Sequence, residues 1–118
     1  SSITFMTAHD AKGYAEHDWR QLVRSGQALA IYMGRTSAPF LQGRLLMAGA
    51  DSNVAVTSIE NISRPSERHF VSTLANFAQQ LKQEQWGGPL IILVGIGKTA
   101  ARMSVSPSDL RAVSDGRP

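Results

Sequence analysis

The chain has 118 residues, of which 42% are hydrophobic and 18% are charged, and its formal net charge is +3. These values are typical of one soluble globular domain of roughly 100 to 150 residues. The absence of cysteine excludes disulfide scaffolds, thiolate catalysis and cysteine–zinc sites, and it fits a cytoplasmic location. No apolar run approaches the roughly 20 residues that cross a bilayer, so we expect no membrane partner.

Short apolar runs rich in β-branched or aromatic residues predict the strands of the fold. Five such runs occur, at residues 3–8, 28–33, 54–60, 68–73 and 90–96.

Helical patterns fill most of the gaps between these runs. A first helix is predicted with Asp18 as its cap and Gly26 as its end, and a second begins at Ser37 and stops at Gly49. We expect Thr73 to cap the third helix. Its apolar stripe, at spacings of i, i+3, i+4 and i+7, consists of Leu74, Phe77, Ala78 and Leu81.

The order of these elements predicts an α/β fold with a mixed five-stranded sheet flanked by helices. Alternation of strands and helices indicates a largely parallel sheet, and the direct link through residues 61–67 indicates one antiparallel pair. We place this domain at residues 1–97. Residues 98–118 lose periodicity and gather Ser, Pro and Arg, which predicts a disordered tail or one short helix.

Known chemical motifs are sparse. The segment 94–99, Val-Gly-Ile-Gly-Lys-Thr, is similar to the end of a phosphate-binding loop, but that motif needs glycine where Ile92 stands. We interpret it as a strand end and turn, with a nucleotide-phosphate binder as a minor option. His9, His17 and His69 fall in separate elements, so we expect no metal site. His9 is either a general base, a ligand-facing donor or a structural residue of the next turn.

The 12 Lys and Arg residues are scattered and form no basic run, which is weak evidence for a nucleic acid, so an anionic small molecule competes with RNA or DNA as the partner. Solubilising surface charge is the third interpretation, and we expect no nucleic-acid partner. In open α/β sheets, ligands bind beyond the carboxyl ends of the strands. Tyr32, Met33 and Gly34 stand at such an end. A glycine there lets a ligand approach the backbone closely.

Several segments together resemble a known family, and they follow one another in its order and spacing. They are Thr-Ala-His at 7–9, Asp-Trp at 18–19, Leu-Ala-Ile-Tyr-Met-Gly at 29–34, residues 56–61, Ser-Arg-Pro at 63–65 with Glu-Arg at 67–68, and Pro-Leu-Ile-Ile-Leu-Val-Gly at 89–95. They are similar to the C-terminal lobe of the uroporphyrinogen-III C-methyltransferases, in the tetrapyrrole methylase family of siroheme and cobalamin synthesis.

The resemblance implies a two-lobed enzyme that moves methyl groups from S-adenosylmethionine to uroporphyrinogen III. The products would be precorrin-2 and S-adenosylhomocysteine. We expect a homodimer, because the exposed cleft face of this lobe would be apolar and such a surface tends to find a partner. By motif position, Met33, Ile62 and Leu90 would contact the cofactor. The octacarboxylate substrate would need cationic partners, for which Arg35 and Arg64 are the candidates.

The chain also departs from the family pattern. The glycine-rich N-terminal lobe is missing, so we expect a fragment that is inactive by itself. Ala8 and Ala55 replace a usual glycine and a frequent proline, and Ile62 replaces a small residue where close approach is expected. A non-catalytic module that binds a small ligand or a partner and retains the lobe's fold is therefore the alternative.

Overall fold

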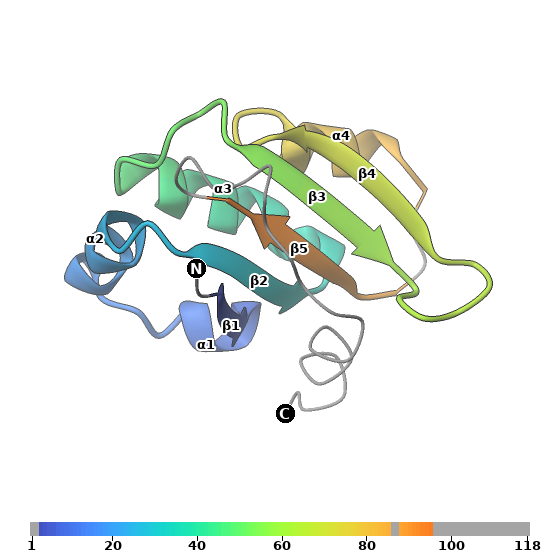
Figure 1. Ribbon diagram of the computed structural model, residues 1–118, viewed down its shortest axis with the longest axis horizontal. Helices are drawn as coiled ribbons and strands as arrows, with labels where there is room; N and C mark the ends of the chain where they lie inside the picture. Colours follow the sequence, from blue (N-terminus) through green and yellow to red (C-terminus); the bar gives the residue numbers. More distant parts are fainter. Residues whose placement is uncertain (1–2, 86–87, 96–118) are drawn as a thin grey trace.

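The computed structural model describes residues 3–85 and 88–95 of the chain, which build one mixed sheet with helices packed on one face (Figure 1). In chain order the elements are β1 (Ile3–Thr7), α1 (Ala8–Ala11), α2 (Glu16–Arg24), β2 (Ala28–Met33), the 3₁₀ turn η1 (Arg35–Ser37), α3 (Ala38–Met47), β3 (Ala55–Glu60), β4 (Arg68–Thr73), α4 (Phe77–Gln83) and β5 (Leu90–Val94).

The five strands lie in the order β1-β2-β5-β3-β4. Only the β1–β2 pair is parallel; β5 runs antiparallel to both of its neighbours, and β3 and β4 form an antiparallel hairpin. The mixed α/β sheet and the hairpin are confirmed, but the expectation of a largely parallel sheet is wrong. The last strand inserts between β2 and β3, and this insertion cannot be read from the order of elements along the chain.

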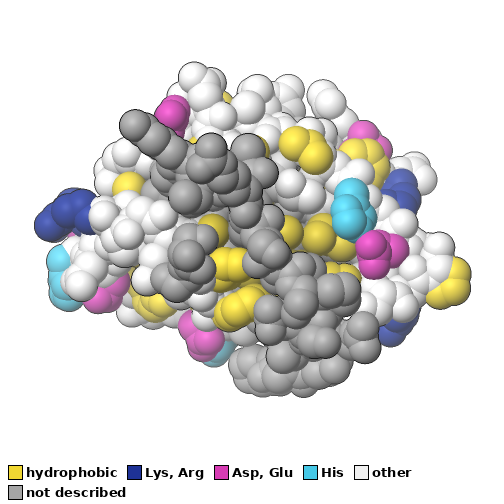
Figure 2. Space-filling model, in the orientation of Figure 1, with side chains coloured by type: hydrophobic (Ala, Val, Ile, Leu, Met, Phe, Trp, Pro, Cys, Tyr) yellow, Lys and Arg dark blue, Asp and Glu magenta, His cyan; other side chains and the backbone are white. Residues whose placement is uncertain are grey.

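The two faces of the sheet differ in what packs on them. Side chains alternate along each strand, so Leu29, Ile31 and Met33 of β2 join the main core with residues of all four α-helices. Ala30 lies on the opposite face, in a smaller apolar cluster with Ile59 and Ile91. Figure 2 looks onto this second face, where hydrophobic side chains gather near the centre of the described surface.

The strand predictions agree with the structure to within one residue at the first three strands and β4, while β5 ends at Val94. Ala8 and His9, expected at the end of the first strand, instead begin α1. The helical turn forms because the Thr7 side-chain oxygen accepts a hydrogen bond from the Asp10 backbone N–H, at 3.0 Å.

Two capping predictions are wrong. Asp18 is not the residue before α2 but lies in its first turn, where its carboxylate accepts a hydrogen bond from the Ala15 backbone N–H at 2.8 Å. Thr73 is the last residue of β4, and α4 begins only at Phe77, after a turn closed by the Asn76 N–H on the Thr73 carbonyl. All four members of the predicted apolar stripe are buried, but Leu74 precedes α4 and only the other three belong to the helix.

The predicted tail, residues 98–118, lies outside the described residues, as does most of the glycine-lysine segment that follows β5. Among the helices described, none is both long and apolar enough to cross a membrane.

Candidate functional site

The carboxyl ends of β1, β2 and β3 meet at one edge of the sheet, together with the first residue of β5. The strand register pairs Met33 with Leu90 and pairs Leu90 with Glu60. Glu60 in turn pairs with Arg68 of β4. One row of residues therefore crosses four strands at this edge, with Met33 and Leu90 side by side as 2% and 1% exposed side chains.

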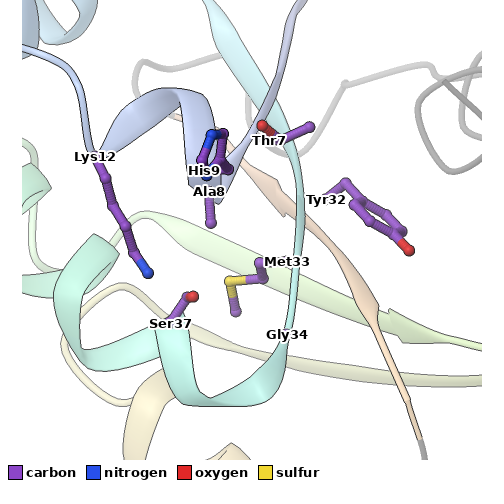
Figure 3. A pocket seen from close by; sticks show the side chains of 8 residues that line it. All are labelled: Thr7, Ala8, His9, Lys12, Tyr32, Met33, Gly34 and Ser37. Carbon is purple, nitrogen blue, oxygen red and sulfur yellow. The ribbon is translucent and has the colours of Figure 1, made fainter. Parts of the chain in front are cut away.

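A cavity of about 440 Å³ opens at the ends of β1 and β2. Its lining residues are Thr7, Ala8, His9, Lys12, Tyr32, Met33, Gly34 and Ser37. Figure 3 shows the Met33 thioether turned toward α1 and η1, whereas the Tyr32 ring points the other way, as the alternation of a strand requires. The wall near Met33 is thus apolar and the rim is polar.

Gly34 leaves the backbone of this edge accessible. A Cβ atom built at Gly34 would meet nothing within 4 Å, so the space next to this peptide is open. The cavity is therefore able to admit a ligand against the backbone that follows Met33.

The Arg35 side chain caps the C-terminal end of α4. One nitrogen of its guanidinium donates to the carbonyl oxygens of Leu81 and Glu84, at 3.3 and 3.0 Å, where α4 ends. Helix C-termini leave carbonyl groups without partners inside the helix, and a cation there satisfies them. The arginine predicted to bind substrate thus has a structural role that the sequence did not reveal.

The hairpin loop between β3 and β4 depends on local hydrogen bonds. Asn61 and Ser63 have φ angles of 54° and 70°, in the left-handed region. The Glu67 carboxylate accepts a hydrogen bond from the Ser63 backbone N–H at 2.6 Å and contacts the His69 ring. The Ser63 hydrogen bond and, next, the His69 hydrogen bond hold the pKa of Glu67 below its ordinary value.

Ile62 and Arg64 sit in this loop in different environments. Ile62 packs against the apolar cluster on the sheet face opposite the helices. Arg64 is exposed, and its guanidinium makes no hydrogen bond or ion pair within the described residues. Neither residue lines the cavity beside Met33.

An ion pair between a buried carboxylate and an exposed arginine joins the hairpin to the rest of the edge. The Glu60 side chain is only 4% exposed, and its carboxylate accepts a hydrogen bond from Arg68 Nε at 2.8 Å. The Arg68 guanidinium also donates to the Gln85 carbonyl and lies over the Phe70 ring. Glu60 and Arg68 therefore link β3 and β4 to the segment that leads into β5.

The structure brings some predicted site residues together and separates others. Met33 and Leu90 are adjacent in the strand register, whereas Ile62 and Arg64 lie in the loop that follows Glu60. Arg35 is bound to the end of α4. Sequence reasoning missed Lys12 and Ser37 as cavity residues. The signal for Ser37 was its position just after the β2 end; Lys12 carried none, because α1 was not predicted.

The described residues contain no group of three or more His, Asp or Glu side chains able to hold a metal ion. His9 lines the cavity, His17 lies on α2 and His69 on β4.

No family model matches the chain, but individual proteins do. A siroheme synthase of Pseudoalteromonas translucida is 34% identical over 94 residues, which cover 80% of this chain and 20% of that protein. A uroporphyrinogen-III C-methyltransferase of Synechocystis is 28% identical over 97 residues, covering 80% of this chain and 37% of its own length. The chain thus spans well under half of the length of these curated relatives.

Solved structures that share the fold include two tetrapyrrole methyltransferases. A cobalt precorrin-4 methyltransferase superposes with a TM-score of 0.69 at 14% identity, over 80% of this chain and 40% of that one. A Thermus thermophilus uroporphyrin-III C-methyltransferase in complex with S-adenosylhomocysteine gives 0.63 at 24% identity, over 86% and 44%. At these identities the likeness establishes the fold, and the resemblance expected from the sequence is confirmed.

Proposed function

Because the chain is homologous to segments of siroheme synthases and uroporphyrinogen-III C-methyltransferases, we propose that it is the C-terminal lobe of an S-adenosylmethionine-dependent methyltransferase. The proposed reaction converts uroporphyrinogen III to precorrin-2 and releases S-adenosylhomocysteine. The single observation that supports it most is the 34% identity to a siroheme synthase over 80% of this chain. The lobe boundary at residue 97, a homodimer and a cytoplasmic location stay predictions.

The residues at the sheet edge fit the cofactor. An apolar wall formed by Met33 and Ala8, next to open space at Gly34, suits a flat organic cation. We assign contact with the cofactor to Met33 from the β2 tip, to Leu90 beside it and to the backbone of Ile62. S-adenosylmethionine would supply a methyl group already activated by its sulfonium.

The chain's own residues would then act by position rather than by acid–base chemistry. Holding two reactants in a productive geometry lowers the barrier without a proton transfer. Two features give this edge a fixed shape. One is the buried row from Met33 to Glu60, and the other is the set of hydrogen bonds that Arg35 and Arg68 donate. Arg64, exposed on the hairpin, is our candidate partner for a substrate carboxylate.

The test is calorimetry of S-adenosylhomocysteine with the natural protein that carries this chain. Met33→Leu removes the thioether while keeping the volume, so we expect a folded protein with several-fold weaker binding. Met6→Leu is the matched control, because Met6 is also buried in the main core, on β1, but does not line the cavity.

The two outcomes separate cleanly. Weaker binding in Met33→Leu alone supports the proposed site. A folded wild-type protein that releases or absorbs no heat with S-adenosylhomocysteine contradicts the enzyme and favours the non-catalytic module.

A further inference from the structure

The cavity beside Met33 contains one full cation among its described lining residues, Lys12. Lys12 follows α1 directly, and its backbone N–H donates to the Ala8 carbonyl at 3.1 Å, which fixes where its side chain starts. In Figure 3 the Lys12 side chain extends so that its ammonium points toward Ser37, and both residues line the same cavity as Met33.

The Lys12 ammonium and the Ser37 hydroxyl are both available to hydrogen-bond a ligand. Within the described residues, neither the Lys12 ammonium nor the Ser37 hydroxyl makes a side-chain hydrogen bond, and Lys12 has no ion pair. Among the described residues that line the cavity there is no Asp or Glu. An ammonium with three donors and a hydroxyl beside it match the acceptor oxygens of a carboxylate.

The two arginines expected to meet an acidic ligand are located elsewhere. The Arg35 guanidinium donates to carbonyls at the end of α4, and Arg64 lies on the hairpin loop. Neither lines this cavity. Lys12 is thus the cation that the described lining offers to a ligand lying against Met33.

We infer that Lys12, together with the Ser37 hydroxyl, forms a carboxylate-binding subsite in the cavity next to Met33. The inference rests on the proposed function, which supplies two sources of the carboxylate. One is an acidic side chain of the tetrapyrrole, and the other is the amino-acid carboxylate of the methyl donor.

The experiment measures binding by the natural protein that carries this chain and by three variants. Lys12→Gln removes the charge, Lys12→Arg keeps it, and Lys82→Gln removes an equal charge from the exposed side of α4, away from the cavity. The probes are uroporphyrin III, S-adenosylhomocysteine, and methylthioadenosine, which lacks the amino-acid carboxylate.

We expect Lys12→Gln to weaken binding of one acidic probe by roughly tenfold, with Lys12→Arg and Lys82→Gln near wild type. If Lys12→Gln loses affinity only for uroporphyrin III, the bound carboxylate belongs to the tetrapyrrole. If Lys12→Gln loses affinity for S-adenosylhomocysteine but not for methylthioadenosine, the bound carboxylate belongs to the methyl donor.

Two results overturn the subsite. The first is wild-type affinity of Lys12→Gln for both acidic probes, and the second is an equal loss in Lys82→Gln, which would show a general charge effect. A wild-type protein that binds none of the probes instead refutes the proposed function, and the subsite with it.

Discussion

The β2–β5 end of the candidate site consists of buried strand residues, whereas the β3–β4 hairpin loop consists mostly of exposed residues joined by hydrogen bonds. Met33 and Leu90 are core side chains whose positions follow from the strand register. Asn61 and Ser63 adopt left-handed backbone conformations, and the loop is held by contacts such as Glu67 on the Ser63 N–H. A ligand would therefore meet one wall fixed by packing and another that local hydrogen bonds shape.

The largest effect is expected at the packed end. Leu90→Ala should lower the free energy of unfolding by about 3 kcal/mol, because it opens a cavity beside Met33 in the main core. Leu93→Ala, on the partly buried opposite face of the same strand, should cost less than half of that. Urea unfolding of both variants gives the comparison, and equal losses would contradict the difference in packing between the two faces.

Arg35 and Arg64 distinguish the two regions by stability and by binding. Arg35→Leu should lower the free energy of unfolding by about 1–2 kcal/mol, since charge-assisted hydrogen bonds to the α4 carbonyls are lost. Arg64→Leu should leave stability within about 0.5 kcal/mol of wild type, because Arg64 is exposed. Thermal unfolding checks both values.

The same pair of variants sharpens the assignment of the substrate's partner. Affinity for uroporphyrin III should fall in Arg64→Leu without a change in stability. An Arg64→Leu protein with unchanged affinity removes Arg64 from the proposed site.

Much of this difference between regions was readable from the sequence. The β-branched runs predicted β2, β3 and β4 because such residues suit a pleated, buried surface. The placement of β5 between β2 and β3 was not predictable, since antiparallel insertion depends on tertiary packing. That Met33 and Leu90 contribute to one site was implied by the family resemblance alone.

The cavity rim was the least predictable part. A helix of four residues such as α1 is too short to show a period in the sequence, so Lys12 was not linked to Met33. The binding of Arg35 to α4 likewise joins residues 46 and 49 positions apart, which no local pattern encodes. The unpredicted contacts are thus the ones between elements distant along the chain.

The smallest effect is expected in the hairpin loop. Because the pKa of Glu67 in the folded protein lies below its unfolded value, its ionised form adds stability above the unfolded pKa, and this is lost as the pH falls through the folded pKa. The Glu67 side chain is one-third exposed, so the contribution is about 0.5 kcal/mol after screening.

Glu67→Gln should remove the pH-dependent contribution of this carboxylate to the free energy of unfolding. Thermal unfolding from pH 6 down to pH 3 should show the wild-type advantage over Glu67→Gln shrinking as the pH falls. An advantage that stays constant across this range would show that the Ser63 N–H does not depend on the ionised carboxylate.

The most direct test of the account is methyl transfer from labelled S-adenosylmethionine to uroporphyrinogen III by the natural protein that carries this chain. We predict label in the tetrapyrrole, transferred more slowly by Met33→Leu and at the wild-type rate by Met6→Leu. A folded protein that transfers no label, or one whose rate is the same in Met33→Leu as in wild type, would contradict the claim that the β2 tip contacts the methyl donor.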